Sequence, residues 1–287
     1  AAEPSPPDDA PDLEAGTGAL VNALLENTAA GTTRIYAIDI NGTVLDGWPV
    51  SLTALLPDVL PFVGPQHTAA AGDVDGDGSD EIVASATTGD VHVIEGDGSI
   101  TVLATNGVVQ GGVSSESSRI LNLFEYPIIA DLNGSGGLDV ATGGLTANAA
   151  VNLVLVGQNL PYNHVVQAWD TALPESYLPG YPTATDDYQL LSSPAAADVT
   201  GDGSTELLVG TGLYLLHAYD ASGLEAADFP KLMGGWIFNV PAVGDIDGDG
   251  LLEMAAGTRE GYRFVWDLDA PATQAAINQW PMEGHDP

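Results

Sequence analysis

Short runs of small, apolar and β-branched residues alternate along the chain with turns rich in glycine, proline, aspartate and asparagine. In the unit that recurs, a short apolar run leads into an acidic, glycine-rich loop and a second apolar run. Past a glycine comes a β-branched and aromatic run, as at 214–219 and 262–266. Such runs between turn residues are typical of β-strands, and residues 19–27 are the one candidate for a helix. The pattern predicts an all-β chain.

Turn residues and prolines predict how the strands of a unit are connected. Hairpin turns are expected at Asn41-Gly42, Asp97-Gly98 and Ser222-Gly223. An aromatic-proline pair follows in several units, and proline is best placed on an edge strand because it has no N–H to donate. The pairs are Trp48-Pro49, Tyr181-Pro182, Phe229-Pro230 and Trp280-Pro281. Each unit therefore reads as strand, acidic loop, strand, turn, strand, turn and edge strand.

Five units can be traced, at roughly 13–62, 63–112, 120–185, 190–235 and 237–283. Four antiparallel strands in a repeat of about 45 residues or somewhat more match a blade of a β-propeller. A parallel solenoid is the competing repeat fold, but its units are shorter and need no hairpin turns. Five blades fit the length, and a ring of seven in a longer parent chain is the alternative. The first unit shows its late strands but lacks the acidic loop.

The composition narrows the class of protein further. No apolar stretch is long enough for a membrane-spanning helix. The absence of cysteine excludes disulfides, thiolate metal sites and a cysteine nucleophile. Residues 1–12 hold four prolines and several acids, which indicates a disordered leader or linker, and we expect the propeller to occupy 13–287. The chain opens without methionine and lacks a signal segment, which favours a mature or excised form.

The net charge of the chain indicates which classes of partner it can bind. The chain has 40 acidic residues against 5 basic ones, for a net charge of −35. A nucleic-acid binder needs lysine and arginine to neutralise phosphate, so nucleic acid and anionic lipid surfaces are unsuited as partners. Divalent cations are suited. The remaining acid excess indicates a solvated surface of the kind that is useful in high salt, where screening limits self-repulsion.

Four acidic loops occupy the same place in their units. Ca²⁺ takes six to eight oxygen ligands, and residues at alternating positions of a tight loop can turn their oxygens to one point. Glycines between them permit the positive φ that such winding needs. The predicted ligands, with the fourth residue of each set acting through its backbone carbonyl, are Asp73, Asp75, Asp77, Ser79 and Glu81; Asp131, Asn133, Ser135, Gly137 and Asp139; Asp198, Thr200, Asp202, Ser204 and Glu206; and Asp245, Asp247, Asp249, Leu251 and Glu253. About four Ca²⁺ ions are expected.

Two other interpretations compete with calcium binding at these loops. An EF-hand loop needs glutamate at its twelfth position, which here holds Ala84, Thr142, Val209 and Ala256, and it needs helical flanks. Acidic turns can also be plain exposed hairpins, but the repetition of the oxygen pattern four times favours metal binding. Mg²⁺ fits less well, because it keeps its waters and prefers strict octahedral geometry.

The loops and the order of strands resemble the FG-GAP/VCBS repeats of integrin α-subunit propellers and of many secreted bacterial proteins. The resemblance covers about residues 30–283, and it implies that the calcium loop joins the first two strands of each blade. The chain departs from the pattern at Asn133, Ser135 and Thr200, where acids are replaced, and in the first unit. These departures bear on the affinity for calcium rather than on the fold.

No catalytic motif stands out. His67, His92, His164, His217 and His285 are scattered, and we interpret His92 and His217 as equivalent strand residues. Two classes of function stay open: a secreted or cell-surface binding or scaffold module that is not an enzyme, and a polysaccharide-active enzyme. Contacts with a protein or polysaccharide are expected on the insertions 106–124 and 143–187. The second carries Tyr162, His164, Trp169, Tyr177, Tyr181 and Tyr188, for which inward packing is the alternative.

Overall fold

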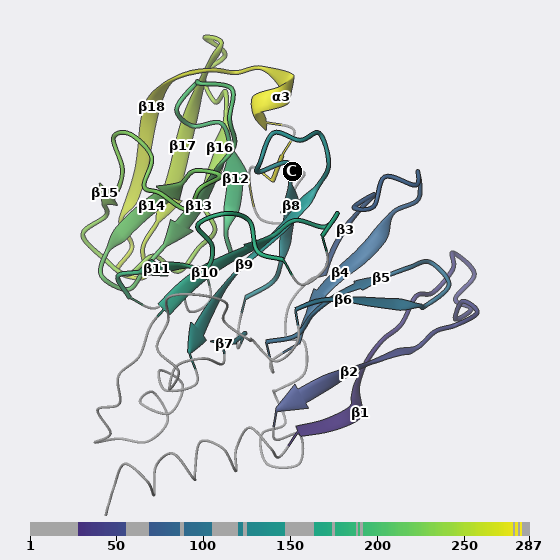
Figure 1. The fold of residues 1–287 in the computed structure, drawn as a ribbon. Helices are drawn as coiled ribbons and strands as arrows, with labels where there is room; N and C mark the ends of the chain where they lie inside the picture. The colour runs from purple at the N-terminus through teal and green to yellow at the C-terminus, as the bar shows by residue number, and fades with distance from the viewer. Residues whose placement is uncertain are drawn as a thin grey trace, which may run out of the picture.

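The computed structural model describes residues 28–55, 69–86, 89–104, 120–122, 125–146, 164–173, 176–187, 189, 192–277, 279, 280 and 282. In this part of the chain, five antiparallel sheets follow one another in sequence order (Figure 1). Helix is confined there to one four-residue segment, α3 (Gln274–Ile277). No helix in the same residues is long and apolar enough to cross a membrane. The leader predicted at 1–12 and the helix candidate at 19–27 lie outside the described residues.

The sheets have two to five strands each. The first contains β1 (Thr28–Ile35) and β2 (Val50–Leu55), and the second β3 (Ala70–Gly72), β4 (Glu81–Ser85), β5 (Val91–Ile94) and β6 (Ile100–Ala104). The third contains β7 (Ile120–Leu121), β8 (Ile128–Ala130), β9 (Asp139–Thr146), β10 (His164–Trp169) and β11 (Thr183–Thr185). The fourth contains β12 (Ala195–Ala197), β13 (Glu206–Gly210), β14 (Leu215–Tyr219) and β15 (Lys231–Leu232), and the fifth β16 (Ala242–Gly244), β17 (Leu251–Gly257) and β18 (Arg263–Pro271).

Each sheet lies within one of the five predicted units, and the fold is an all-β propeller of antiparallel blades. The second and fourth sheets have four strands paired in chain order, as expected for a complete blade. The fifth sheet departs from the prediction, because β18 is its last paired strand in the described residues. The three predicted hairpin turns are present, and at each of them backbone hydrogen bonds close the turn, as between Glu95 and Ser99.

Side chains on the two faces of a strand pack against different neighbouring sheets. In β13, Leu207 and Val209 join a core cluster with residues of the third sheet, whereas Leu208 joins one with residues of the fifth. This alternation follows from the pleat, which turns successive side chains to opposite faces. A third cluster, which includes Leu52 and Ile94, joins the first sheet to the second. The core is therefore a series of layers between consecutive sheets.

A repeated contact links neighbouring sheets at the aromatic-proline pairs. The Trp48 indole donates a hydrogen bond to the Gly96 carbonyl at 3.0 Å, and the Tyr181 hydroxyl donates one to the Asp220 carbonyl at 2.9 Å. Both acceptors lie at the hairpin turn of the following sheet. Trp48-Pro49, Tyr181-Pro182 and Phe229-Pro230 are cis and directly precede β2, β11 and β15, which are outermost in their sheets. The predicted edge position is confirmed for these three pairs.

The prediction for the fourth pair, Trp280-Pro281, is wrong. Trp280 does not extend the fifth sheet but forms an antiparallel bridge with Ala196 of β12, in the fourth sheet. The two residues exchange backbone hydrogen bonds of 2.7 and 3.0 Å. β12 has β13 on one side only, so its other edge offers free N–H and C=O groups, and Trp280 takes them.

Glycine is required beside Tyr181, where the third and fourth sheets approach each other. Gly180 has φ of +85°, and a Cβ there would lie 1.7 Å from the Ser222 carbonyl oxygen of the next sheet. Gly180→Ala should therefore lower the free energy of unfolding by about 2 to 4 kcal/mol, through a clash with backbone and strain at positive φ. Urea unfolding measures this.

Gly42→Ala is the matched control. Gly42 has φ of +84°, but a Cβ added there would meet no atom within 4 Å. Its substitution should cost only the conformational strain, about 1 to 2 kcal/mol. Equal losses in the two variants would show that the approach of the sheets at Gly180 is not what requires glycine.

Candidate metal sites

Each of the four acidic loops connects two consecutive strands of its sheet, which are the first two strands in the second, fourth and fifth sheets and are β8 and β9, after β7, in the third. The first loop (residues 73–81) follows β3 and the second (131–139) follows β8. The third loop (198–206) follows β12, and the fourth (245–253) follows β16. The position that the family resemblance implies is therefore confirmed in the second, fourth and fifth sheets, whereas in the third sheet the short strand β7 precedes the two strands that the loop joins. In each sheet the loop lies at the same end, between two strands that pair directly.

The first aspartate of a loop holds the loop's backbone in place. The Asp73 carboxylate accepts the N–H of Gly76 at 2.8 Å and the N–H of Gly78 at 3.0 Å. Gly76 and Gly78 have φ of +78° and +93°, which only glycine adopts without strain. Asp198 and Asp245 accept from the equivalent pairs of glycines. The glycines of the motif thus turn their N–H groups inward.

The last carboxylate of each loop is buried, although it lies within the first three residues of a strand next to an exposed loop. Glu81, Asp139, Glu206 and Glu253 have exposed fractions of 0%, 2%, 2% and 4%. Each accepts the N–H of the second residue in its own loop, at 2.6 to 3.0 Å. A carboxylate that is removed from water and hydrogen-bonded only to neutral donors still lacks a counter-charge.

Three loops gather carboxylate oxygens within 4.8 Å of one another. The groups are Asp73, Asp75 and Glu81; Asp198, Asp202 and Glu206; and Asp245, Asp247 and Glu253. The spacing suits a cation that three carboxylates share. Asp77 and Asp249 stand outside the groups, and each accepts the N–H two residues later, from Ser79 and Leu251. The ligand roles of these two side chains and of the four backbone carbonyls stay predictions.

The second loop has only two acids, Asp131 and Asp139. The Asn133 amide donates to the Asp139 carboxylate at 3.1 Å, while the amide oxygen accepts the Ser135 N–H at 2.8 Å. The Ser135 hydroxyl accepts the Gly137 N–H at 3.2 Å. The predicted oxygen ligands are therefore close together, but their lone pairs are partly used by donors of the loop itself.

Two buried carboxylate oxygens indicate whether the loops fit a cation. Oε1 of Glu81 and Oδ1 of Asp131 are buried and have no hydrogen-bond partner. A buried acceptor without a donor costs about 1 to 3 kcal/mol. A cation in the loop would supply the missing partner. The residues present therefore fit a hard cation that is bound through oxygen.

Burial also raises the pKa of two of the last carboxyl groups. The pKa of Asp139 rises to about 7 because burial disfavours the charged form, against hydrogen bonds from Asn133 and Leu132 that favour it. The pKa of Glu206 rises to about 7 for the same reason, against a hydrogen bond from Val199. Without a cation, each of these groups is about half protonated at neutral pH.

The described histidines are strand residues. His92 of β5 pairs with Ala84, and His217 of β14 pairs with Val209, so the predicted equivalence of the two is confirmed. Burial lowers the pKa of His92 and of His164, which keeps both rings neutral at neutral pH. His67 and His285 lie outside the described residues.

His217 differs because two carboxylates flank it. Nδ1 lies 2.7 Å from Glu225 and Nε2 lies 3.1 Å from Asp186, which belongs to the turn after β11 of the preceding sheet. Burial alone lowers the pKa of His217, but Glu225 and Asp186 outweigh it and the pKa is raised. Sequence reasoning missed this cluster because no local motif connects Asp186 to His217.

The aromatic residues expected on a binding loop pack inward where the structure describes them. His164, Trp169 and Tyr181 have exposed fractions of 3%, 1% and 6%, and Tyr177 stacks on Trp169 at 5.1 Å. These described aromatic side chains therefore belong to the blade core. Tyr162 and Tyr188 lie outside the described residues, as does most of 106–124.

The raised pKa of His217 predicts a pH-dependent contribution to stability. The protonated ring is favoured in the folded state, so this stability is complete below the unfolded pKa and is lost as pH rises through the folded pKa. His217→Gln should destabilise by about 1 to 3 kcal/mol at pH 5.5, and by less at pH 8. Urea unfolding at fixed calcium concentration measures the difference.

His92→Gln provides the control of opposite sign. Because the pKa of His92 is lowered, protonation opposes folding, and the wild type loses stability relative to this variant as pH falls. A cost of His217→Gln that grows with rising pH would contradict the assignment.

Comparison with known proteins gives one family. The FG-GAP repeat family matches residues 67–103, which span the second sheet with the first loop. No curated protein matches the chain significantly.

Several solved structures have similar folds at low sequence identity. The Vibrio cholerae biofilm matrix protein Bap1 is 15% identical with a TM-score of 0.48, over 89% of this chain and 65% of that one. BBS1N in complex with ARL6DN is 10% identical with a TM-score of 0.42, over 84% and 60%. BamB from Moraxella catarrhalis is 10% identical with a TM-score of 0.25, over 84% and 79%. The chain spans less than two thirds of the first two, and none of these likenesses bears on function.

The match and the geometry agree on the same unit. Residues 67–103 contain the strand, the acidic loop and the three further strands of one blade. The loops of the third, fourth and fifth sheets repeat the hydrogen bond from the second residue of the loop to its last carboxylate. The chain therefore carries an FG-GAP repeat, as one blade of a β-propeller built on that plan.

Proposed function

We propose that this protein is an extracellular calcium-binding β-propeller that serves as a binding or scaffold module and not as an enzyme. The observation that carries the proposal is the group of carboxylates at the same end of three sheets, with the buried, unpartnered Oε1 of Glu81 among them. The ion's contribution is charge: it neutralises carboxylates that the fold removes from water.

Calcium is favoured by the chemistry of the loops. Their side chains offer carboxylate, amide and hydroxyl oxygens, and calcium accepts six to eight such ligands in flexible geometry. The ions would be held by Asp73, Asp75 and Glu81, by Asp198, Asp202 and Glu206, and by Asp245, Asp247 and Glu253. A fourth ion in the second loop would use Asp131, Asn133 and Asp139.

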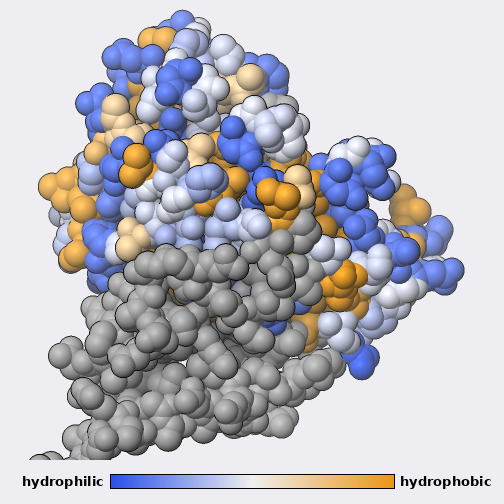
Figure 2. Space-filling view, viewed as in Figure 1, coloured by the Kyte–Doolittle hydropathy of each residue, from blue (hydrophilic) through white to orange (hydrophobic). Residues whose placement is uncertain are grey.

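An extracellular role as a scaffold is supported by composition and by the family match. A chain without cysteine needs another means of fixing its loops outside the cell, and metal ions supply one. The net charge of −35 suits a protein that stays in solution beside other proteins or polysaccharides. On the face in Figure 2, hydrophobic residues form small groups between hydrophilic ones.

Partner contacts are best sought at the turns opposite the loops. Leu213 and Tyr214 precede β14, Tyr262 precedes β18, and their exposed fractions are 55%, 45% and 54%. Close by in sequence, the Arg259 guanidinium lies over the Trp236 ring at 5.2 Å. Exposed aromatic side chains and arginine are enriched in protein interfaces. The partner we propose is a protein or polysaccharide of an extracellular assembly.

Removal of calcium tests the proposal. EDTA should lower the melting temperature substantially, and Ca²⁺ should restore it better than Mg²⁺. Each site contributes about 2.7 kcal/mol when the free ion is at a hundred times its Kd. Differential scanning calorimetry with metal analysis measures the effect. An unchanged melting temperature after proven removal of metal would refute calcium binding, and new unsaturated ends on a polysaccharide substrate would refute a non-catalytic role.

The loops should differ in affinity. The second loop has two predicted carboxylate ligands where the first and fourth have four, and ligand charge tunes the affinity for calcium. Asp245→Ala should therefore lower the melting temperature in calcium more than Asn133→Ala does. With EDTA present, the two variants should melt closer together. The reverse order in calcium would show that charge does not rank the sites.

A further inference from the structure

The C-terminal segment contacts three of the four acidic loops. We define the C-terminal strap as residues 272–277, 279 and 280, which include α3. The backbone N–H of Ala272 donates to the Gly250 carbonyl of the fourth loop at 2.9 Å. The N–H of Asp198, in the third loop, donates to the Ala276 carbonyl at 3.3 Å. The N–H of Asp131, in the second loop, donates to Oε1 of Gln279 at 2.9 Å.

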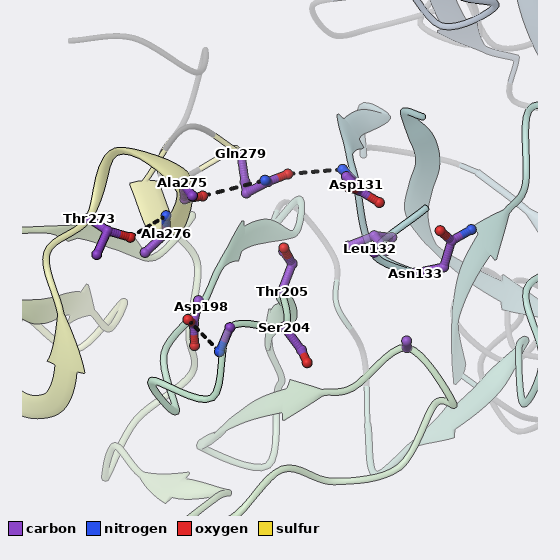
Figure 3. Close-up of a pocket in the computed structure, with 13 residues that line it drawn as sticks. Asp131, Leu132, Asn133, Asp198, Ser204, Thr205, Thr273, Ala275, Ala276 and Gln279 are labelled. Atoms are coloured by element: carbon purple, nitrogen blue, oxygen red, sulfur yellow. Dashed lines mark hydrogen bonds between the residues drawn. The ribbon is translucent and has the colours of Figure 1, made fainter. Parts of the chain in front are cut away.

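Two of these bonds fix residues that are proposed to bind the ion. Asp131 and Asp198 are the first aspartates of their loops, and the strap accepts their own N–H groups. Figure 3 shows the bond from Asp131 to Gln279. Fixing the backbone of a ligand residue fixes where its carboxylate can point. The free oxygen of Asp131 is buried and has no hydrogen-bond partner, so its placement matters most.

The strap is also fixed to the sheet beside these loops. Trp280 pairs with Ala196, two residues before Asp198, and its exposed fraction is 6%. Between the strap and the second and third loops lies a pocket of about 260 Å³, lined on one side by Thr273, Ala276 and Gln279 (Figure 3). The strap and the two loops therefore line the same pocket.

The first loop provides a contrast within the same chain. In the described residues, the hydrogen bonds of Asp73 involve Gly76 and Gly78, and none reaches the strap. The first loop lies in the second sheet, whereas the strap contacts loops of the third, fourth and fifth sheets. An effect that passes through the strap should therefore leave the first loop unchanged.

We propose that the C-terminal strap couples the cation sites of the second, third and fourth loops, with Gln279 as the residue that positions Asp131. The inference rests on the proposed function, because it concerns cation binding by those loops. When a cation binds in one loop, the backbone of that loop becomes ordered and fixes the strap through their hydrogen bond. The fixed strap in turn orders the backbones of the other two loops. Since coupling between sites is reciprocal, loss of one site weakens the others.

Hydrogen exchange measured by mass spectrometry at increasing Ca²⁺ concentration tests the coupling in the full chain. In the wild type, peptides that contain the second, third and fourth loops and the strap should become protected together. Gln279→Met, which keeps the length but removes the acceptor, should shift the midpoint of the second loop about three- to tenfold higher. Gln279→Glu, which keeps an acceptor oxygen, should restore it.

The first loop serves as the internal control. Its midpoint should be the same in Gln279→Met as in the wild type, and an equal shift of all four loops would reduce the effect to general destabilisation and overturn the proposal. Asp198→Asn should lower the protection of the strap and of the second loop. If the loops respond to Ca²⁺ while the strap does not, only the coupling fails. If no loop responds, the proposed function fails as well.

Discussion

Burial of the last carboxylate of an acidic loop is the constraint on which four of the five sheets depend. Glu81, Asp139, Glu206 and Glu253 occupy the same position in their loops and are all almost fully buried. Each closes its loop by accepting a backbone N–H, and so connects the strand before the loop to the strand after it. A buried negative charge needs compensation, and the loop places further oxygens around it. The strand connection and the cation site are therefore one structure.

The sequence predicted what depends on local geometry. Glycines at fixed intervals between acids specify a wound loop, and the turn pairs such as Asp97-Gly98 specify hairpins, so the loops and most strand positions were expected correctly. The same holds for three aromatic-proline pairs. In these cases the side chain and the backbone group with which it interacts lie close together in the chain, or the edge position follows from the missing N–H of proline.

The departures all involve partners from distant parts of the chain. Trp280 begins a Trp-Pro pair, as Trp48 does. It nevertheless pairs with β12, because that strand has an edge with free backbone N–H and C=O groups. The pKa of His217 is raised by Glu225 and by Asp186 of the preceding sheet, and the acceptor for the Asp131 N–H is Gln279. No periodicity records such contacts. The carboxylate groups also differ between loops, since position five contributes in the third loop and position three in the first and fourth.

Among the described residues, β18 pairs with β17 on one side and has no strand on its other side, which has a consequence for solubility. An unpaired strand edge of nine residues is a template on which a second chain can pair, and Val265 adds an apolar side chain with an exposed fraction of 60%. Asp267 and Asp269 follow it at alternate positions and are exposed. Two copies that approached edge to edge would bring these carboxylates together. The acid excess thus acts here as a local guard against aggregation, and its protection weakens as salt screens the charges.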